Sequence, residues 1–175
     1  MNYNEEMKEI IKNKKGDRLL MHSCCAPCSS SVIERLKNDF EITVLFYNPN
    51  IEPKEEYIKR KNEQIKLLDK LNIKYLDTDY LNEEFREKIK GFEKEKEGGK
   101  RCTLCYGLRL SKTGKVAKEK NFDYFTTTLT VSPYKNSKTI NLIGLNIEKK
   151  ENIKYLVSDF KKEDGYKKSI ELSSI

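Results

Sequence analysis

Residues 19–28 read Leu19-Leu20-Met21-His22-Ser23-Cys24-Cys25-Ala26-Pro27-Cys28, an apolar run that ends at two adjacent cysteines and is followed by a third. Such a run is typical of a short buried strand. A second pair lies downstream, in Gly98-Gly99-Lys100-Arg101-Cys102-Thr103-Leu104-Cys105. All five cysteines of the chain therefore lie in two tight clusters. If the fold brings these clusters together, they offer enough thiolates to bind zinc or an iron–sulfur cluster.

The length of the chain, 175 residues, is typical of one domain with its own core, so we predict a single domain over residues 1–175. Residues 1–15 are polar and charged, and no apolar run approaches the roughly 20 residues that a membrane span needs. These features predict a cytoplasmic protein without membrane association. In a reducing compartment, clustered cysteines more often bind metal or act in catalysis than form disulfides.

The formal net charge of +7, with 36% charged residues, fits a polyanionic partner such as nucleic acid. A solvated surface of interspersed Lys and Glu explains much of the same charge, so the charge does not identify a partner by itself. The sequence lacks a GxGxxG motif, a Walker lysine and an HExxH motif. Nucleotide hydrolysis and zinc proteolysis therefore have no support.

Strand-like and helix-like segments alternate along the chain. We predict strands over residues 18–22, 41–47, 73–77 and 153–157, and a further strand within residues 122–130. Helices are predicted over residues 4–12, 29–38, 53–71, 82–90, 103–120, 138–149 and 165–172, the second of them capped by Ser29, Ser30 or Ser31. This alternation predicts an α/β fold with a doubly wound, mostly parallel five-stranded sheet, Rossmann-like or HUP-like.

Side chains capable of chemistry follow each predicted strand. In doubly wound sheets, ligands bind beyond the carboxyl ends of the strands, so these side chains are expected to share one edge. They are Cys24 and Cys25 after the first strand, residues 47–50 after the second, Asp77 and Asp79 after the third, residues 128–135 after the fourth and Asp159 after the fifth.

The downstream pair, Cys102 and Cys105, has the spacing with which two thiolates bind one centre, and a helix N-terminus favours the thiolate form. A reactive redox pair and incidental cysteines are the alternatives. Adjacent Cys24 and Cys25 do not form a disulfide without strain, which favours metal ligation over simple burial of one of them.

The segment Cys25-Ala26-Pro27-Cys28 resembles the Cys-x-x-Cys motif of thiol oxidoreductases, so a thiol–disulfide oxidoreductase using Cys25 and Cys28 is a serious alternative. This alternative leaves Cys24, Cys102 and Cys105 without a role. Four ligands suffice for one cluster, and we therefore predict that Cys28 is packed beneath the loop.

Several polar residues are candidates for catalysis or substrate contact. His22, Tyr47 and Asp79 could donate a proton, although a hydrogen-bonded core histidine is the simpler interpretation of His22. Arginines near the cysteines, Arg101 and Arg109, could bind an anion or belong to a solvated surface. Polar strand ends and basic residues give the predicted substrate or phosphate contacts Asn48, Arg101, Thr128 and Lys135.

Five segments together resemble the QueH family of epoxyqueuosine reductases, and the resemblance covers nearly the whole chain. They are residues 22–28, 46–51, 98–105, 123–130 and 159–162. The resemblance implies a [4Fe–4S] enzyme that reduces the epoxide of epoxyqueuosine at the wobble position of tRNA, which completes queuosine. It implies the cluster ligands Cys24, Cys25, Cys102 and Cys105. It also implies an external electron donor and leaves room for an additional mononuclear iron.

The C-terminal end departs from the family pattern. The family continues beyond the stretch 169–173 to a Tyr-Cys-Gly-Cys motif whose cysteines form a redox pair, whereas this sequence stops at Ile175. The resemblance thus predicts a C-terminally truncated chain whose activity is impaired and whose last helix leaves apolar surface uncovered. A cluster- or zinc-stabilised RNA-binding protein without redox activity is the alternative from another functional class.

Overall fold

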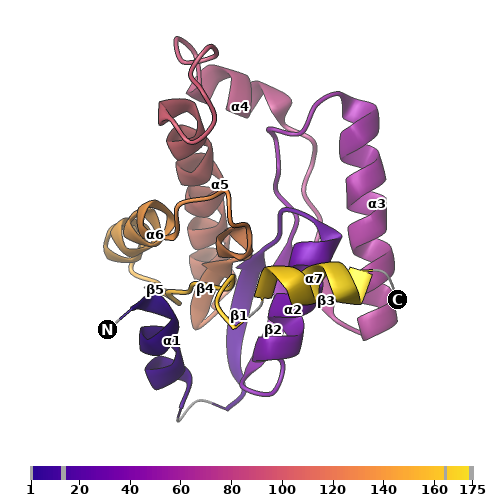
Figure 1. Cartoon of the computed structure of the whole chain (residues 1–175), viewed down its shortest axis with the longest axis vertical. Coiled ribbons are helices and arrows are strands. Elements are labelled where there is room, and N and C mark those ends of the chain that lie inside the picture. Colours follow the sequence, from indigo (N-terminus) through magenta and orange to yellow (C-terminus); the bar gives the residue numbers. More distant parts are fainter. Residues whose placement is uncertain (1, 13–14, 164, 174–175) are drawn as a thin grey trace.

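The computed structural model describes residues 2–12, 15–163 and 165–173 (Figure 1). Its five strands form one sheet in the order β3-β2-β1-β4-β5, and each pair of neighbours is parallel. The strands are β1 (Asp17–His22), β2 (Phe40–Leu45), β3 (Lys74–Leu76), β4 (Tyr124–Thr127) and β5 (Lys154–Tyr155). The predicted α/β fold is confirmed, and the described sheet is wholly rather than mostly parallel.

Helices connect the strands and cover both faces of the sheet (Figure 1). They are α1 (Tyr3–Ile11), α2 (Ala26–Leu36), α3 (Lys54–Leu71), α4 (Asn82–Lys88), α5 (Lys100–Glu119), α6 (Ser137–Glu151) and α7 (Gly165–Ser173). The fourth strand lies within residues 122–130 as predicted and ends at Thr127, where the chain turns into a short 3-10 helix, η1 (Leu129–Val131). None of the described helices combines the length and the apolar composition needed to cross a bilayer.

Successive side chains of β1 point to opposite faces of the sheet, so the core has two layers. Leu19 and Met21 point to one face, where α1, α2 and α3 pack against them. Leu20 points to the other face, where α5 and α6 pack. All three side chains are fully buried, as expected for the central strand of a sheet that is covered on both sides. This arrangement is the predicted double winding.

The start of α2 differs from the prediction that Ser29, Ser30 or Ser31 caps it. The helix begins at Ala26, with Cys25 in the N-cap position and proline in the first turn, where its missing N–H costs nothing. The three serines therefore lie inside the helix. Their hydroxyls donate to backbone carbonyls three residues earlier.

The last described helix, α7, lies across α2 in Figure 1. The turn before it is tied to the N-terminal half of the chain by Glu163, whose carboxylate pairs with Lys8 at 2.7 Å and with Arg35 at 2.8 Å. A helix beginning at Gly165 was predicted and is confirmed. The apolar surface expected to stay uncovered at its end lies outside the described side chains.

The sheet topology leaves one clear place for a site. The chain leaves β1 toward β2 on one side and returns through β4 on the other, so the crossovers diverge at the carboxyl end of β1. The first cysteine segment follows β1 directly, which puts it at this position.

Candidate metal centre

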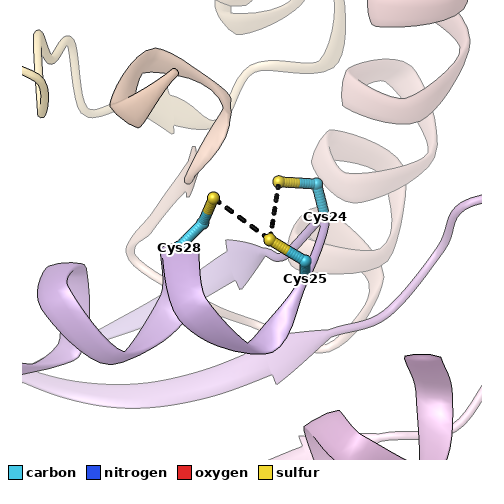
Figure 2. A group of neighbouring side chains, drawn as sticks. All are labelled: Cys24, Cys25 and Cys28. Carbon is cyan, nitrogen blue, oxygen red and sulfur yellow. Dashed lines mark hydrogen bonds between the residues drawn. The ribbon is translucent and has the colours of Figure 1, made fainter. Parts of the chain in front are cut away.

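Three cysteines gather where β1 passes into α2 (Figure 2). The Sγ atoms of Cys24 and Cys25 are 4.0 Å apart, and those of Cys25 and Cys28 are 3.1 Å apart. All three sulfurs lie within 4.8 Å of one another. Among the described residues, no other set of three or more Cys, His, Asp or Glu side chains is close enough to share a metal ion. The first turn of α2 turns the Cys28 sulfur toward Cys25, and its side chain also packs against the core cluster on the α2 face of the sheet. That Cys28 is not a ligand stays a prediction.

Neutral hydrogen bonds hold this first cysteine segment, residues 24–28, in place. The buried Ser23 hydroxyl donates to Gln64 Oε1 at 2.7 Å, and Gln64 Nε2 donates to the Ser29 hydroxyl at 2.9 Å. On the other side, the backbone N–H of Cys24 donates to Thr128 Oγ1 at 3.3 Å. The segment is therefore anchored to α3, α2 and the end of β4.

The three thiols of the segment share their protons unequally. Hydrogen bonds from Cys25 and Cys28 hold the pKa of Cys24 well below its usual range, with smaller contributions from Thr128 and the positive charge of Lys135. The same hydrogen bond to Cys24 raises the pKa of Cys25 to about 12, and the pKa of Cys28 is raised as well. These directions favour the thiolate form at Cys24 over Cys25 and Cys28.

Cys102 and Cys105 lie on the wall of a cavity of about 380 Å³ beside the first turns of α5. The Cys102 sulfur accepts from the Gly98 N–H at 3.4 Å, and Cys105 is buried among apolar side chains of α4 and its C-terminal flank. The other lining residues are Asn50, Glu52, Phe85, Arg86, Ile89, Glu93, Glu97, Arg101, Tyr106, Arg109 and Lys135.

The two cysteine segments face one region of the molecule. Lys135 lines the cavity of Cys102 and Cys105, and its charge also acts on Cys24. Cys24 and Cys102 pack against the same hydrophobic cluster on the α5 face of the sheet. The described geometry does not bring all five sulfurs into one group, and whether one centre joins both segments stays a prediction.

Two polar atoms in the cavity wall have no hydrogen-bond partner among the described residues: the Asn50 Oδ1 acceptor and the Arg109 Nε donor. The wall of the cavity also carries charged side chains, among them Arg101, Arg109 and Lys135, so the cavity is suited to a polar or charged occupant. Thiolates are soft ligands that suit zinc or iron–sulfur clusters. The residues present therefore fit such a group.

His22, one of the three predicted proton donors, is fully buried. Its ring nitrogens lie 3.0 Å from Thr127 Oγ1 and 3.0 Å from the Tyr47 carbonyl oxygen. Burial, reinforced by the charge of Arg109, lowers the pKa of His22 to about 4. The imidazole is thus neutral at pH 7 and holds the ends of β1, β4 and β2 together.

Neither of the other two predicted donors lines the cysteine cavity. Tyr47 is 1% exposed, and its hydroxyl donates to Glu84 at 3.1 Å; burial raises its pKa, followed by the effect of Glu84. Asp79 is exposed and lines a different cavity beside Lys112. Their roles as acids stay predictions that this placement does not favour.

The predicted substrate contacts divide into two kinds. Asn48 and Thr128 are buried, and protein groups occupy their side chains. Arg101 and Lys135 are partly exposed and line the cavity. Asn50, from the predicted strand-end stretch 47–50, also lines the cavity. Sequence reasoning missed the cavity residue Tyr106, because no motif sets it apart from an ordinary helix residue.

The family profile described as "Epoxyqueuosine reductase QueH" matches residues 19–175. Proteins named epoxyqueuosine reductase QueH share this similarity: one from Streptococcus pyogenes is 43% identical, over 98% of this chain and 71% of its own length. Another, from Staphylococcus epidermidis, is 40% identical, over 98% of this chain and 77% of its own length. The chain belongs to the QueH family of epoxyqueuosine reductases. The predicted family and the predicted oxidoreductase class are thereby confirmed.

More distant members keep the similarity. The QueH of Thermotoga maritima is 35% identical, over 89% of this chain and 81% of its own length. A solved structure described as a predicted subunit of a tRNA methyltransferase from Methanocaldococcus jannaschii superposes with a TM-score of 0.55, over 91% of this chain and 74% of the other. Its sequence identity is 15%, so this likeness concerns the fold alone.

Proposed function

We propose that this chain reduces the epoxide of epoxyqueuosine in tRNA to give queuosine, and that it acts in the cytoplasm with an external electron donor. A [4Fe–4S] cluster held by Cys24, Cys25, Cys102 and Cys105 would supply the electrons one at a time. An additional mononuclear iron belongs to the same proposal. Removal of an epoxide oxygen as water consumes two electrons and two protons.

The observation that carries the proposal is that both cysteine segments border the region around Lys135, at the carboxyl edge of the sheet. The cavity of about 380 Å³ there lies within the usual range for small-ligand sites. Its wall combines apolar side chains with the charged side chains of Arg101 and Lys135. Such a cavity suits a modified base better than an extended RNA backbone.

The residues of the chain bind and protonate the substrate in this proposal. Phe85, Ile89 and Tyr106 form the apolar part of the wall and keep water from the reacting base. Lys135 Nζ, a charged ammonium on the same wall, delivers a proton to the oxygen that leaves the epoxide. Burial raises the pKa of Tyr106 to about 12, so its phenol stays protonated at neutral pH.

Recognition of one base within tRNA requires that base to leave the anticodon stack. Tyr134, next to Lys135, is 76% exposed and offers its ring to a splayed base, whereas the buried Tyr47 does not. The net charge of +7 supports contact with the phosphate backbone, so affinity should fall steeply with rising salt.

The test is anaerobic purification followed by assay on tRNA that carries epoxyqueuosine. We expect a brown protein with about four irons and four sulfides per chain, or about five irons if the mononuclear site is filled. With a chemical reductant, nucleoside mass spectrometry should show queuosine. One zinc without sulfide, together with intact epoxide, would favour the RNA-binding alternative; a Cys25–Cys28 disulfide couple active on protein thiols would favour the oxidoreductase alternative.

A further inference from the structure

Arg109 is a buried cation without a carboxylate partner among the described residues. Its side chain lies on α5 and is 5% exposed. Nη1 donates to Asn48 Oδ1 at 3.2 Å, while Nε has no hydrogen-bond partner among the described residues. No ion pair formed within the described part of the chain includes Arg109. The ring of Tyr106, 5.9 Å from the guanidinium carbon, is its other favourable contact.

Such burial is unusual, because arginine is seldom fully buried unless it is paired. One neutral hydrogen bond and a distant ring do not offset the loss of water around a unit charge. The cavity beside Arg109 contains the carboxylates Glu52, Glu93 and Glu97, but Glu52 pairs with Arg86 and none lies within ion-pairing distance of Arg109. A negative charge that occupies the cavity would complete this environment.

The helix identifies where that negative charge should lie. Cys102, Cys105 and Arg109 are spaced i, i+3 and i+7, so they share one side of α5, and all three line the cavity. Arg109 is thus one to two turns from the two thiols, on the order of 6 to 10 Å along the helix axis. Thiolates bound to an oxidised iron–sulfur core leave the whole group negatively charged.

We propose that Arg109 is the internal counter-charge of the metal group held by Cys102 and Cys105, and that it raises the reduction potential of that group. The proposal rests on the proposed cluster. Net charge and hydrogen bonding around a cluster set its potential, and reduction adds one negative charge that a nearby cation stabilises. Arg109 is a positioning and tuning residue here, without contact to the substrate.

Asn48 holds the guanidinium in place. Its Oδ1 accepts from Arg109, and its Nδ2 donates to the Ser23 carbonyl at 2.8 Å, immediately before Cys24. The amide is 1% exposed, so it is part of the protein interior. One hydrogen-bonded path therefore joins the α5 side of the cavity to the first cysteine segment, which keeps the cation at a fixed position between them.

The test compares the cluster potentials of Arg109→Gln, Arg109→Lys and wild type in an anaerobic redox titration followed by EPR. For Arg109→Gln, the equilibrium constant for reduction should fall roughly tenfold, a shift of about 59 mV to lower potential. Arg109→Lys keeps the charge and should shift less. Lys115→Gln removes the same charge from an exposed position of α5 and should leave the potential unchanged, because solvent screens it.

Two further measurements keep the outcomes distinct. Wild-type protein without a cluster would refute the proposed function, whereas a wild-type cluster whose potential Arg109→Gln leaves unchanged would refute only the counter-charge. Weaker, less salt-dependent tRNA binding in Arg109→Gln at an unchanged potential would make Arg109 a phosphate contact instead. If Arg109→Gln does not fold, Asn48→Asp tests the proposal instead. A carboxylate at position 48 would neutralise the charge of Arg109 without removing its side chain, and it should also lower the reduction potential of the cluster.

Discussion

The two cysteine segments differ in what surrounds their sulfur atoms. Residues 24–28 follow the central strand, their sulfurs already face one another, and neutral hydrogen bonds from Gln64 and Thr128 surround them. Cys102 and Cys105 are spaced by a regular helix on the wall of an open cavity, with the charge of Arg109 on the same side. One segment is preformed by its backbone, and the other depends on what fills the cavity.

This difference assigns two roles: the residues around the first segment stabilise the fold, and the residues on the cavity wall act in metal binding and turnover. Loss of a support residue around the first segment should change the stability of the fold, because those groups are buried and hydrogen-bonded to one another. Changes on the cavity wall should change metal binding and turnover with less effect on folding. The predictions below test this division, beginning with the largest effect.

Alanine substitution of a cluster ligand should have the largest effect. In Cys24→Ala and Cys102→Ala, we expect loss of the visible chromophore and of most bound iron, because each iron of a cubane normally takes one protein ligand. Iron and sulfide analysis after anaerobic reconstitution measures this loss. Cys28→Ala is the matched control and should keep most of the chromophore. A variant series in which Cys28→Ala loses all iron and Cys102→Ala loses none would reverse the ligand assignment.

Loss of the ammonium on the cavity wall should mainly slow turnover. Lys135→Met should lower kcat on tRNA by about 10²-fold or more, the usual contribution of a positioned acid, while the iron content stays near that of wild type. Lys138→Met removes an exposed charge from the next helix and serves as the control. Equal losses of tRNA affinity in both variants, with kcat preserved, would show that Lys135 acts only through its charge.

The support around the first segment should weaken in acid. His22 has an ordinary pKa of 6.5 that folding lowers to about 4, so between these values the unfolded chain binds a proton that the folded chain does not. Stability is therefore fully present above pH 6.5 and falls by about 3 kcal/mol as pH drops to 4. Urea unfolding of the metal-free protein across this range measures the slope. His22→Gln should flatten it, and an equally steep slope in that variant would assign the titration to other groups.

A neutral support residue should have the smallest effect. Gln64→Leu leaves the hydroxyls of Ser23 and Ser29 without their side-chain partner in a buried position, and should lower the free energy of unfolding by about 2 kcal/mol. Chemical denaturation measures the change. Glu63→Ala, an exposed neighbour on α3, should stay within about 0.5 kcal/mol of wild type. Similar values for the two variants would mean that water replaces the lost hydrogen bonds.

Much of the fold was predictable because local rules decide it. The apolar strands and the alternating helices gave the parallel sheet, and the rule on strand ends placed Cys24 at the correct edge. The start of α2 was missed because three serines look like caps, whereas proline in the first turn lets the helix begin earlier.

The site itself was less predictable from sequence. Spacing identified both cysteine segments, but the direction of the Cys28 side chain depends on where α2 begins, so its close contact with the Cys25 sulfur was not predicted. Arg109 resembled the exposed arginines in sequence, since only packing shows that it is buried. His22 and Tyr47 were plausible acids by residue type, yet tertiary contacts occupy their polar atoms.

The central claim is that one metal group joins the two cysteine segments, and site-resolved alkylation tests it most directly. Cluster-loaded and chelator-treated protein would be treated anaerobically with iodoacetamide, and each cysteine quantified by peptide mass spectrometry. We expect Cys24, Cys25, Cys102 and Cys105 to gain protection together on loading, while Cys28 reacts alike in both forms. Protection confined to Cys24, Cys25 and Cys28, with Cys102 and Cys105 unchanged, would contradict the account.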